Sequence, residues 1–143
     1  MRVFVAGASG AIGIPLVRAL VSHGDEVSAL TRTPGKIPYL RELDATPFLA
    51  DALDRGALTR AVRDARPTHV VHQLTALPPA GVRTARDLEA TNRLRIDGTH
   101  NLIEAAVSAG AGRLVIGSFA PLMADTSEVT DKPGIYPLPP PGR

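Results

Sequence analysis

The sequence contains no cysteine and no tryptophan, and its aromatic residues are two tyrosines and three phenylalanines. Without cysteine the chain cannot form disulfides, Cys-ligated zinc sites, iron–sulfur clusters or a thiol nucleophile. An excess of one charge is also missing, because 16 Lys and Arg residues stand against 14 Asp and Glu residues without a basic block. This balance predicts no nucleic-acid partner, although the sequence pI is near 9.5. A chain of 143 residues suits one domain that folds without a disulfide or structural metal.

A hydrophobic run long enough to cross a membrane is missing too. The uncharged run over residues 3–17 follows Arg2 and imitates a signal sequence. A membrane span needs about 20 apolar residues, and three glycines and Pro15 interrupt this shorter run. We therefore expect no membrane association and a cytoplasmic location.

The sequence does contain a regular alternation of β-type runs with amphipathic stretches. The predicted strands are residues 2–6, 26–30, 46–50, 69–72 and 113–117. The predicted helices are residues 12–23, 38–43, 55–64 and 84–108. The last helix is expected to have one stripe made of Asn92, Ile96, Thr99, Ile103 and Ala106.

This alternation predicts the fold. Strands separated by helices cannot pair as hairpins, so they form a parallel sheet through right-handed crossovers, with helices on both faces. The expected fold class is α/β, a Rossmann-type doubly wound parallel sheet with strand order 3-2-1-4-5. We assign residues 1–119 to this domain. Residues 120–143 hold six of the 13 prolines and are expected to be an irregular, proline-rich tail, the start of a missing substrate-binding part.

A glycine-rich turn, Gly7-Ala-Ser-Gly10-Ala-Ile-Gly13, joins the first strand to the first helix. Glycines in this context allow a tight turn, a close backbone approach to a pyrophosphate and close packing of helix on strand. The helix N-terminus adds free N–H groups, and no acidic residue precedes Asp25 to oppose an anion. The turn therefore predicts dinucleotide binding, with a merely tight turn as the alternative. The residues concerned are Gly7, Ser9, Gly10, Ala11, Ile12 and Gly13.

The Gly-x-x-Gly-x-x-Gly spacing resembles that of the extended short-chain dehydrogenase/reductase superfamily, specifically the NAD-dependent epimerase/dehydratase family. The resemblance runs from Met1 to about Ser118 and rests also on Asp51-Ala-Leu-Asp54, Val70-Val-His-Gln-Leu-Thr-Ala76 and the segment 92–106. It thus covers the cofactor half of the family and little of the substrate half.

The resemblance implies roles for single residues. Asp51 and Ala52 belong to the segment near the adenine, and Leu74 and Thr75 to the segment beside the cofactor. Asn92 is implied near the active site, with an ordinary helix-surface asparagine as the alternative. Asp54 is also explained as the N-cap of the helix that starts at residue 55.

The end of the second strand predicts which nicotinamide cofactor is preferred. In this fold an acidic residue about 20 residues beyond the glycines binds the ribose hydroxyls of NAD. Thr31 and Arg32 stand there instead. Arg32 can form charge-assisted hydrogen bonds to a 2′-phosphate, with Lys36 as a second cation. The sequence therefore favours NADP over NAD, with a solvated surface arginine as the alternative.

The resemblance also implies three catalytic groups: a serine after the fifth strand, a tyrosine that moves the proton, and a lysine four residues after the tyrosine. Ser118 matches the serine. The Tyr-x-x-x-Lys pair is absent, because Tyr39 precedes the third strand and Tyr136 is followed four residues later by Pro140. In the family this pair follows the serine by a couple of dozen residues, at or just past Arg143.

Three hypotheses therefore stay open. The first is an NAD(P)-binding protein of the epimerase/dehydratase type that works by hydride transfer on a hydroxyl or carbonyl substrate such as a nucleotide sugar. For the full-length protein of this hypothesis, the resemblance implies a homodimer as one arrangement. The second is a truncated, non-catalytic dinucleotide-binding module, and the third is a family member with a different acid and base. No metal site is predicted, because His69 and His72 point to opposite faces of a strand.

Overall fold

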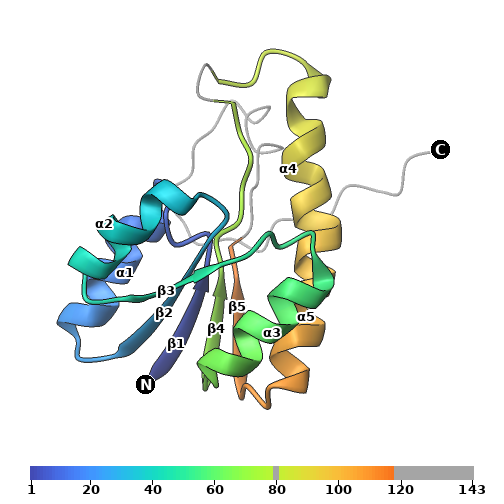
Figure 1. Ribbon diagram of the computed structural model, residues 1–143. Coiled ribbons are helices and arrows are strands. Elements are labelled where there is room, and N and C mark those ends of the chain that lie inside the picture. The colour runs from blue at the N-terminus through green and yellow to red at the C-terminus, as the bar shows by residue number, and fades with distance from the viewer. Residues whose placement is uncertain (79–80, 118–143) are drawn as a thin grey trace, which may run out of the picture.

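The computed structural model describes residues 1–78 and 81–117, and its centre is a five-stranded parallel sheet (Figure 1). The strands are β1 (Arg2–Ala6), β2 (Glu26–Thr31), β3 (Thr46–Leu49), β4 (His69–His72) and β5 (Arg113–Ile116). Each hydrogen-bonded pair is parallel, and the order is β3-β2-β1-β4-β5. The predicted Rossmann-type topology is confirmed.

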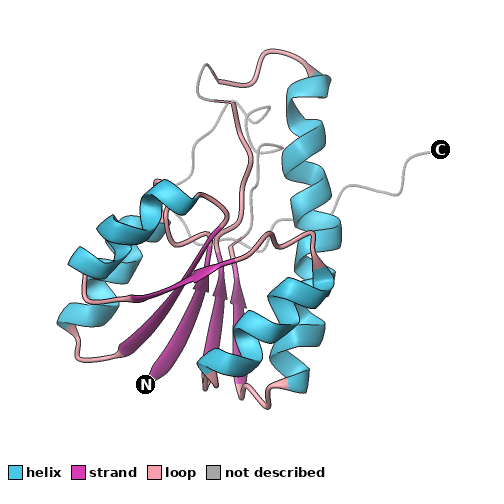
Figure 2. Ribbon diagram, viewed as in Figure 1, coloured by secondary structure: helices cyan, strands magenta, loops and turns pink. Residues whose placement is uncertain are grey.

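Helices cover both faces of this sheet (Figure 2). One face carries α1 (Gly13–Ser22) and α2 (Ile37–Glu42), and the other carries α3 (Arg55–Ala65) and α5 (Thr99–Ser108). A π-helical segment, Leu94–Gly98, joins α4 (Glu89–Arg93) to α5, and 3₁₀ turns span Pro34–Lys36 and Ala85–Leu88. None of the helices in the described part of the chain has the length and apolar content that a membrane crossing requires.

Strand β1 explains why the sheet is covered twice. Val3 and Val5 belong to the core beneath α1 and α2, whereas Phe4 and Ala6 belong to the core beneath α3 and α5. All four side chains are at most 3% exposed. Because successive strand residues point to opposite faces, a strand that is apolar at every position must be buried on both sides.

Helix α3 begins where the sequence places its cap. The Asp54 side chain accepts a hydrogen bond from the backbone N–H of Ala57 at 2.9 Å, which satisfies one free donor of the first turn. From there Leu58 and Val62 are buried against the sheet. The N-cap assignment of Asp54 is confirmed.

Asp54→Ala is expected to lower the free energy of unfolding by about 1 kcal/mol, because the N–H of Ala57 loses its acceptor. Urea denaturation followed by circular dichroism measures this loss. The matched control is Asp64→Ala in the last turn of the same helix, where the side chain is 65% exposed. It should change stability by less than about 0.5 kcal/mol. Equal losses in the two variants would contradict a capping role.

The long helix buries a different stripe from the predicted one. Ile96 is 70% exposed and Ile103 is 40% exposed, whereas Ala106 of the same predicted stripe is 4% exposed, so the predicted stripe is not buried as one face. The buried positions are Thr91, Leu94, Gly98, Leu102, Ala105 and Ala106. This helix is apolar on two neighbouring faces, and the face with the smaller side chains packs closest to the rest of the domain.

Candidate cofactor-binding site

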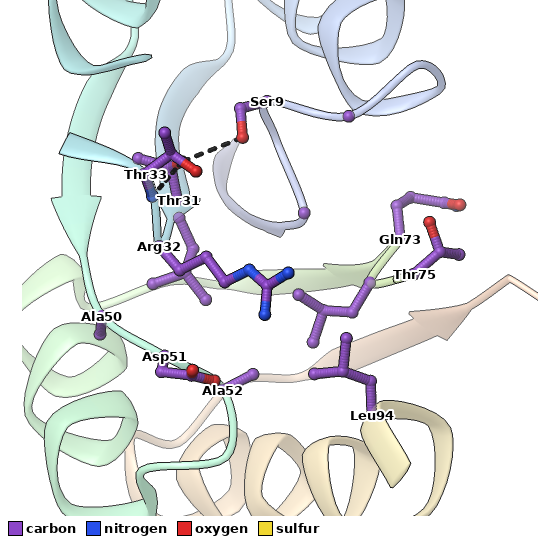
Figure 3. A pocket seen from close by; sticks show the side chains of 14 residues that line it. Ser9, Thr31, Arg32, Thr33, Ala50, Asp51, Ala52, Gln73, Thr75 and Leu94 are labelled. Carbon is purple, nitrogen blue, oxygen red and sulfur yellow. Dashed lines mark hydrogen bonds between the residues drawn. The ribbon is translucent and has the colours of Figure 1, made fainter. Parts of the chain in front are cut away.

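Two cavities open at the carboxyl ends of the strands, the edge at which parallel α/β sheets bind ligands. The first has a volume of about 130 Å³ and lies among the glycine turn and the segments that follow β2 and β3 (Figure 3). The second, of about 290 Å³, lies among the glycine turn, the segment that follows β4 and the α4–α5 helix. Both are lined by Gly10, Gln73, Leu74 and Thr75, so they adjoin as one groove.

The three glycines of the turn meet different surroundings. Gly7 has φ +87°, and a Cβ there would lie 2.5 Å from the carbonyl oxygen of Gln73. A Cβ on Gly13 would overlap the carbonyl oxygen of Gly7. A Cβ on Gly10 would have one neighbour, the same oxygen at 3.3 Å, and Gly10 lines both cavities. Gly7 and Gly13 thus shape the turn, while Gly10 leaves its backbone open to a ligand.

The beginning of α1 offers unused donors to the groove. Within residues 1–78 and 81–117, the backbone N–H groups of Ala11 and Ile12 have no hydrogen-bond acceptor. No acidic residue lies in the first turn of α1, so the positive end of the helix dipole is not neutralised there. Ala11 and Ile12 both line the second cavity. Free donors beside an open glycine backbone fit a diphosphate group.

A cationic side chain at the end of β2 points into the first cavity. Thr31 is 3% exposed, shares a hydrogen bond of 2.9 Å with the Ser9 hydroxyl and accepts one from the backbone N–H of Thr33 at 3.2 Å. Figure 3 shows the next side chain, Arg32, extending from this strand end into the cavity. Among the described residues that line this cavity, Asp51 carries the one carboxylate.

The segment after β3 forms another wall of the first cavity. The Oδ1 atom of Asp51 accepts a hydrogen bond from the backbone N–H of Leu53 at 2.9 Å. Ala52 is 3% exposed, and its carbonyl oxygen accepts a hydrogen bond from the Asn101 amide at 3.0 Å. These bonds tie the segment to itself and to α5, which fixes Asp51 and Ala52 at the cavity.

A buried histidine holds the segment after β4. His72 is 3% exposed, its Nδ1 accepts from the backbone N–H of Leu74 at 3.4 Å, and its Nε2 lies 2.9 Å from the Thr99 hydroxyl. Burial lowers the pKa of His72, and the nearby charge of Arg95 lowers this pKa further. His72 is therefore a neutral imidazole that positions the residues lining both cavities.

The structure brings most of the sequence-predicted site residues to this groove. They are Gly7, Ser9, Gly10, Ala11, Ile12, Arg32, Asp51, Ala52, Leu74 and Thr75. Gly13 is buried behind them in α1. Lys36 and Asn92 are both exposed and line neither cavity. Asn92 follows Thr91, which α4 turns inward, so the asparagine points outward. Ser118 and the predicted tail at residues 120–143 lie outside the described residues.

The sequence-predicted site left out several residues that line the groove, among them one after β4 and three on the last helix. Gln73 follows β4 directly, and Thr91, Leu94 and Arg95 come from the α4–α5 helix. The available signal was the small Gly98, which marks the face of the helix that approaches the sheet. A Cβ on Gly98 would lie 3.7 Å from the Cβ of Ala52.

The fold and the groove define a Rossmann-type nucleotide-binding domain. The chain belongs to the NAD dependent epimerase/dehydratase family, whose family model matches residues 3–140. This confirms the resemblance inferred from the glycine turn.

The proteins to which this chain is similar include two reductases and a solved epimerase. A 3-diazoavenalumate denitrifying reductase from a Streptomyces species is 52% identical over 84% of this chain and 38% of the reductase. A ceramide reductase from Caulobacter vibrioides is 34% identical over 82% of this chain and 35% of the reductase. The solved UDP-glucose 4-epimerase from Thermus thermophilus, in complex with NAD, is 31% identical with a TM-score of 0.65, over 80% of this chain and 36% of the epimerase. The chain thus spans 35–38% of these relatives.

Proposed function

We propose that this chain is the cofactor-binding part of a reductase that transfers a hydride between a nicotinamide dinucleotide and the carbonyl or hydroxyl of a small-molecule substrate. When bound, the nicotinamide supplies the hydride chemistry. The observation that carries the proposal is the open Gly10 backbone beside the unused N–H groups of Ala11 and Ile12, where the two cavities meet. Reduction is favoured over epimerisation because a reductase shares 52% identity with the chain.

We also propose that NADP is preferred over NAD. Arg32 reaches into the first cavity from the strand end where a carboxylate would bind the ribose hydroxyls of NAD (Figure 3). A guanidinium there binds a 2′-phosphate through charge-assisted hydrogen bonds, and Ser9 adds a hydroxyl to the same cavity. NAD is the cofactor in the family's name, so this preference is a property proposed for the present chain.

Arg32→Ala is expected to abolish the preference for NADPH over NADH. The 2′-phosphate loses its cationic partner, so the dissociation constant of NADPH rises about tenfold or more, while that of NADH changes little. Fluorescence titration with the two reduced cofactors measures both constants. Arg41→Ala, which removes an exposed cation of α2, is the control for net charge. Equal affinities of the unaltered chain for NADPH and NADH would contradict the role of Arg32.

A non-catalytic binding module is the second candidate function, because the glycine turn and its groove would bind a dinucleotide in either case. The two functions are separated by adding ketones and nucleotide sugars to the NADPH-bound chain. Loss of NADPH fluorescence reports hydride transfer and supports a catalyst. Stable fluorescence with every substrate supports the module.

A further inference from the structure

The second cavity contains a cation that the glycine turn does not explain. Among the described residues that line this cavity, Arg95 carries the one charged side chain, because His72 is held neutral and no lining residue is acidic. The other lining side chains are apolar or uncharged. Such a cavity partly shields a guanidinium from water. The attraction between the guanidinium and an anion is therefore stronger there than on an open surface.

The helix that carries Arg95 is anchored over the groove. Arg95 belongs to the π-helical segment, and π-helical turns often occur at functional sites. The preceding residue, Leu94, lines the first cavity (Figure 3), so consecutive residues of this segment face the two halves of the groove. The hydrogen bond of Thr99 to His72 holds the next turn of the helix to β4.

Two positive features meet in this cavity from opposite sides of the sheet. Ala11 and Ile12 bring unused N–H donors at the start of α1, and Arg95 comes from the helix that packs on the other face (Figure 1). The cavity lies on the far side of Gly10 from Asp51 and Ala52, the residues implied near the adenine. An anion here would be the part of a dinucleotide nearer to the nicotinamide.

We propose that Arg95 binds the nicotinamide-side phosphate of the dinucleotide from across the groove, opposite the N-terminus of α1. This inference rests on the proposed function, because it assigns a second phosphate-binding element to the same site. Arginine suits this role since its planar guanidinium donates two parallel hydrogen bonds to one phosphate group.

The test uses two probes that differ in the second phosphate. ADP-ribose carries both phosphates, and adenosine 5′-monophosphate carries the adenosine-side phosphate alone. In Arg95→Gln the dissociation constant of ADP-ribose, measured by calorimetric titration, is expected to rise about tenfold. The constant of adenosine 5′-monophosphate should not change, which also shows that the variant is folded. In Arg95→Lys the dissociation constant of ADP-ribose should lie between those of the unaltered chain and Arg95→Gln, because lysine keeps the charge and loses the paired hydrogen bonds.

Arg93→Gln is the matched control, since it removes the same charge from the same helix. The Arg93 side chain is 69% exposed and lies 3.6 Å from Asp97. Arg93→Gln should leave the dissociation constants of ADP-ribose and adenosine 5′-monophosphate unchanged.

Each remaining outcome is decisive. Unchanged ADP-ribose affinity in Arg95→Gln overturns the proposal. Equal weakening of the two probes also overturns it, because Arg95 would then act through the fold. If the unaltered chain binds neither probe, the proposed function fails together with this inference.

Discussion

Gly13→Ala is expected to lower the free energy of unfolding by about 3 kcal/mol, the largest stability change that we predict for a single methyl group in this chain. The added Cβ would overlap the carbonyl oxygen of Gly7 and lie 2.7 Å from the carbonyl carbon of Ala8. Both are backbone atoms of a tight turn, so neither can rotate away. Helix α1 would have to move off the turn and expose Val17, which is fully buried.

Urea denaturation of the unaltered chain and of Gly13→Ala measures this loss of stability. Gly35→Ala is the matched control, because a Cβ at Gly35 meets no atom within 4 Å. It should change stability by less than about 0.5 kcal/mol. If Gly13→Ala proved as stable as Gly35→Ala, this result would contradict the close contact of Gly13 with the backbone of the turn.

Gly10→Val is expected to weaken dinucleotide binding by at least about 100-fold, because the two added methyl groups would occupy space that the diphosphate needs. Gly10 lines both cavities, and a Cβ there would meet the Gly7 carbonyl oxygen at 3.3 Å. The variant should therefore keep its fold, with a stability loss of about 1 kcal/mol. Valine at this position should therefore reduce the affinity for the dinucleotide far more than the stability of the protein.

Fluorescence titration with NADPH, beside urea denaturation, separates these two effects. Gly35→Val provides the control, because residue 35 is exposed and lines neither cavity. Its NADPH affinity should match that of the unaltered chain. Unchanged NADPH affinity in a folded Gly10→Val chain would show that the glycine turn holds no pyrophosphate.

The fold was predictable because its determinants are local. Every residue of β1 from Val3 to Ala6 is apolar, which marks a strand buried on both faces, and the helical stretches between strands exclude hairpins. The crossover rule then leaves few topologies, and the observed order β3-β2-β1-β4-β5 is the predicted one. The Asp54 cap was readable for the same reason, since it involves residues within one helical turn.

The glycine spacing also indicated where the site lies, although it did not separate the roles of the glycines. Gly7 and Gly13 differ from Gly10 in what a Cβ would meet: the backbone of Gln73 for Gly7, and the backbone of the turn for Gly13. The contact with Gln73 joins segments far apart in the chain. Only the packed sheet edge brings them together.

The long helix shows what the sequence could not determine. Ile96 and Leu94 lie on neighbouring apolar faces with the same helical period, so periodicity alone could not choose the inward face. The choice was made by close packing, because Gly98 lets this helix approach Ala52 and the segment after β4. The same rotation turns Asn92 outward and Arg95 into the second cavity.

By itself the sequence determined the strands, their order and the glycine turn, because these follow from short-range periodicity and from spacing within one βα unit. The family followed from a resemblance over several segments of the sequence. Only the tertiary structure decided which face of the last helix lines the groove, and hence that Arg95 rather than Asn92 reaches it. That decision depends on contacts between residues about 20 to 50 positions apart, such as Thr99 with His72 and Asn101 with Ala52.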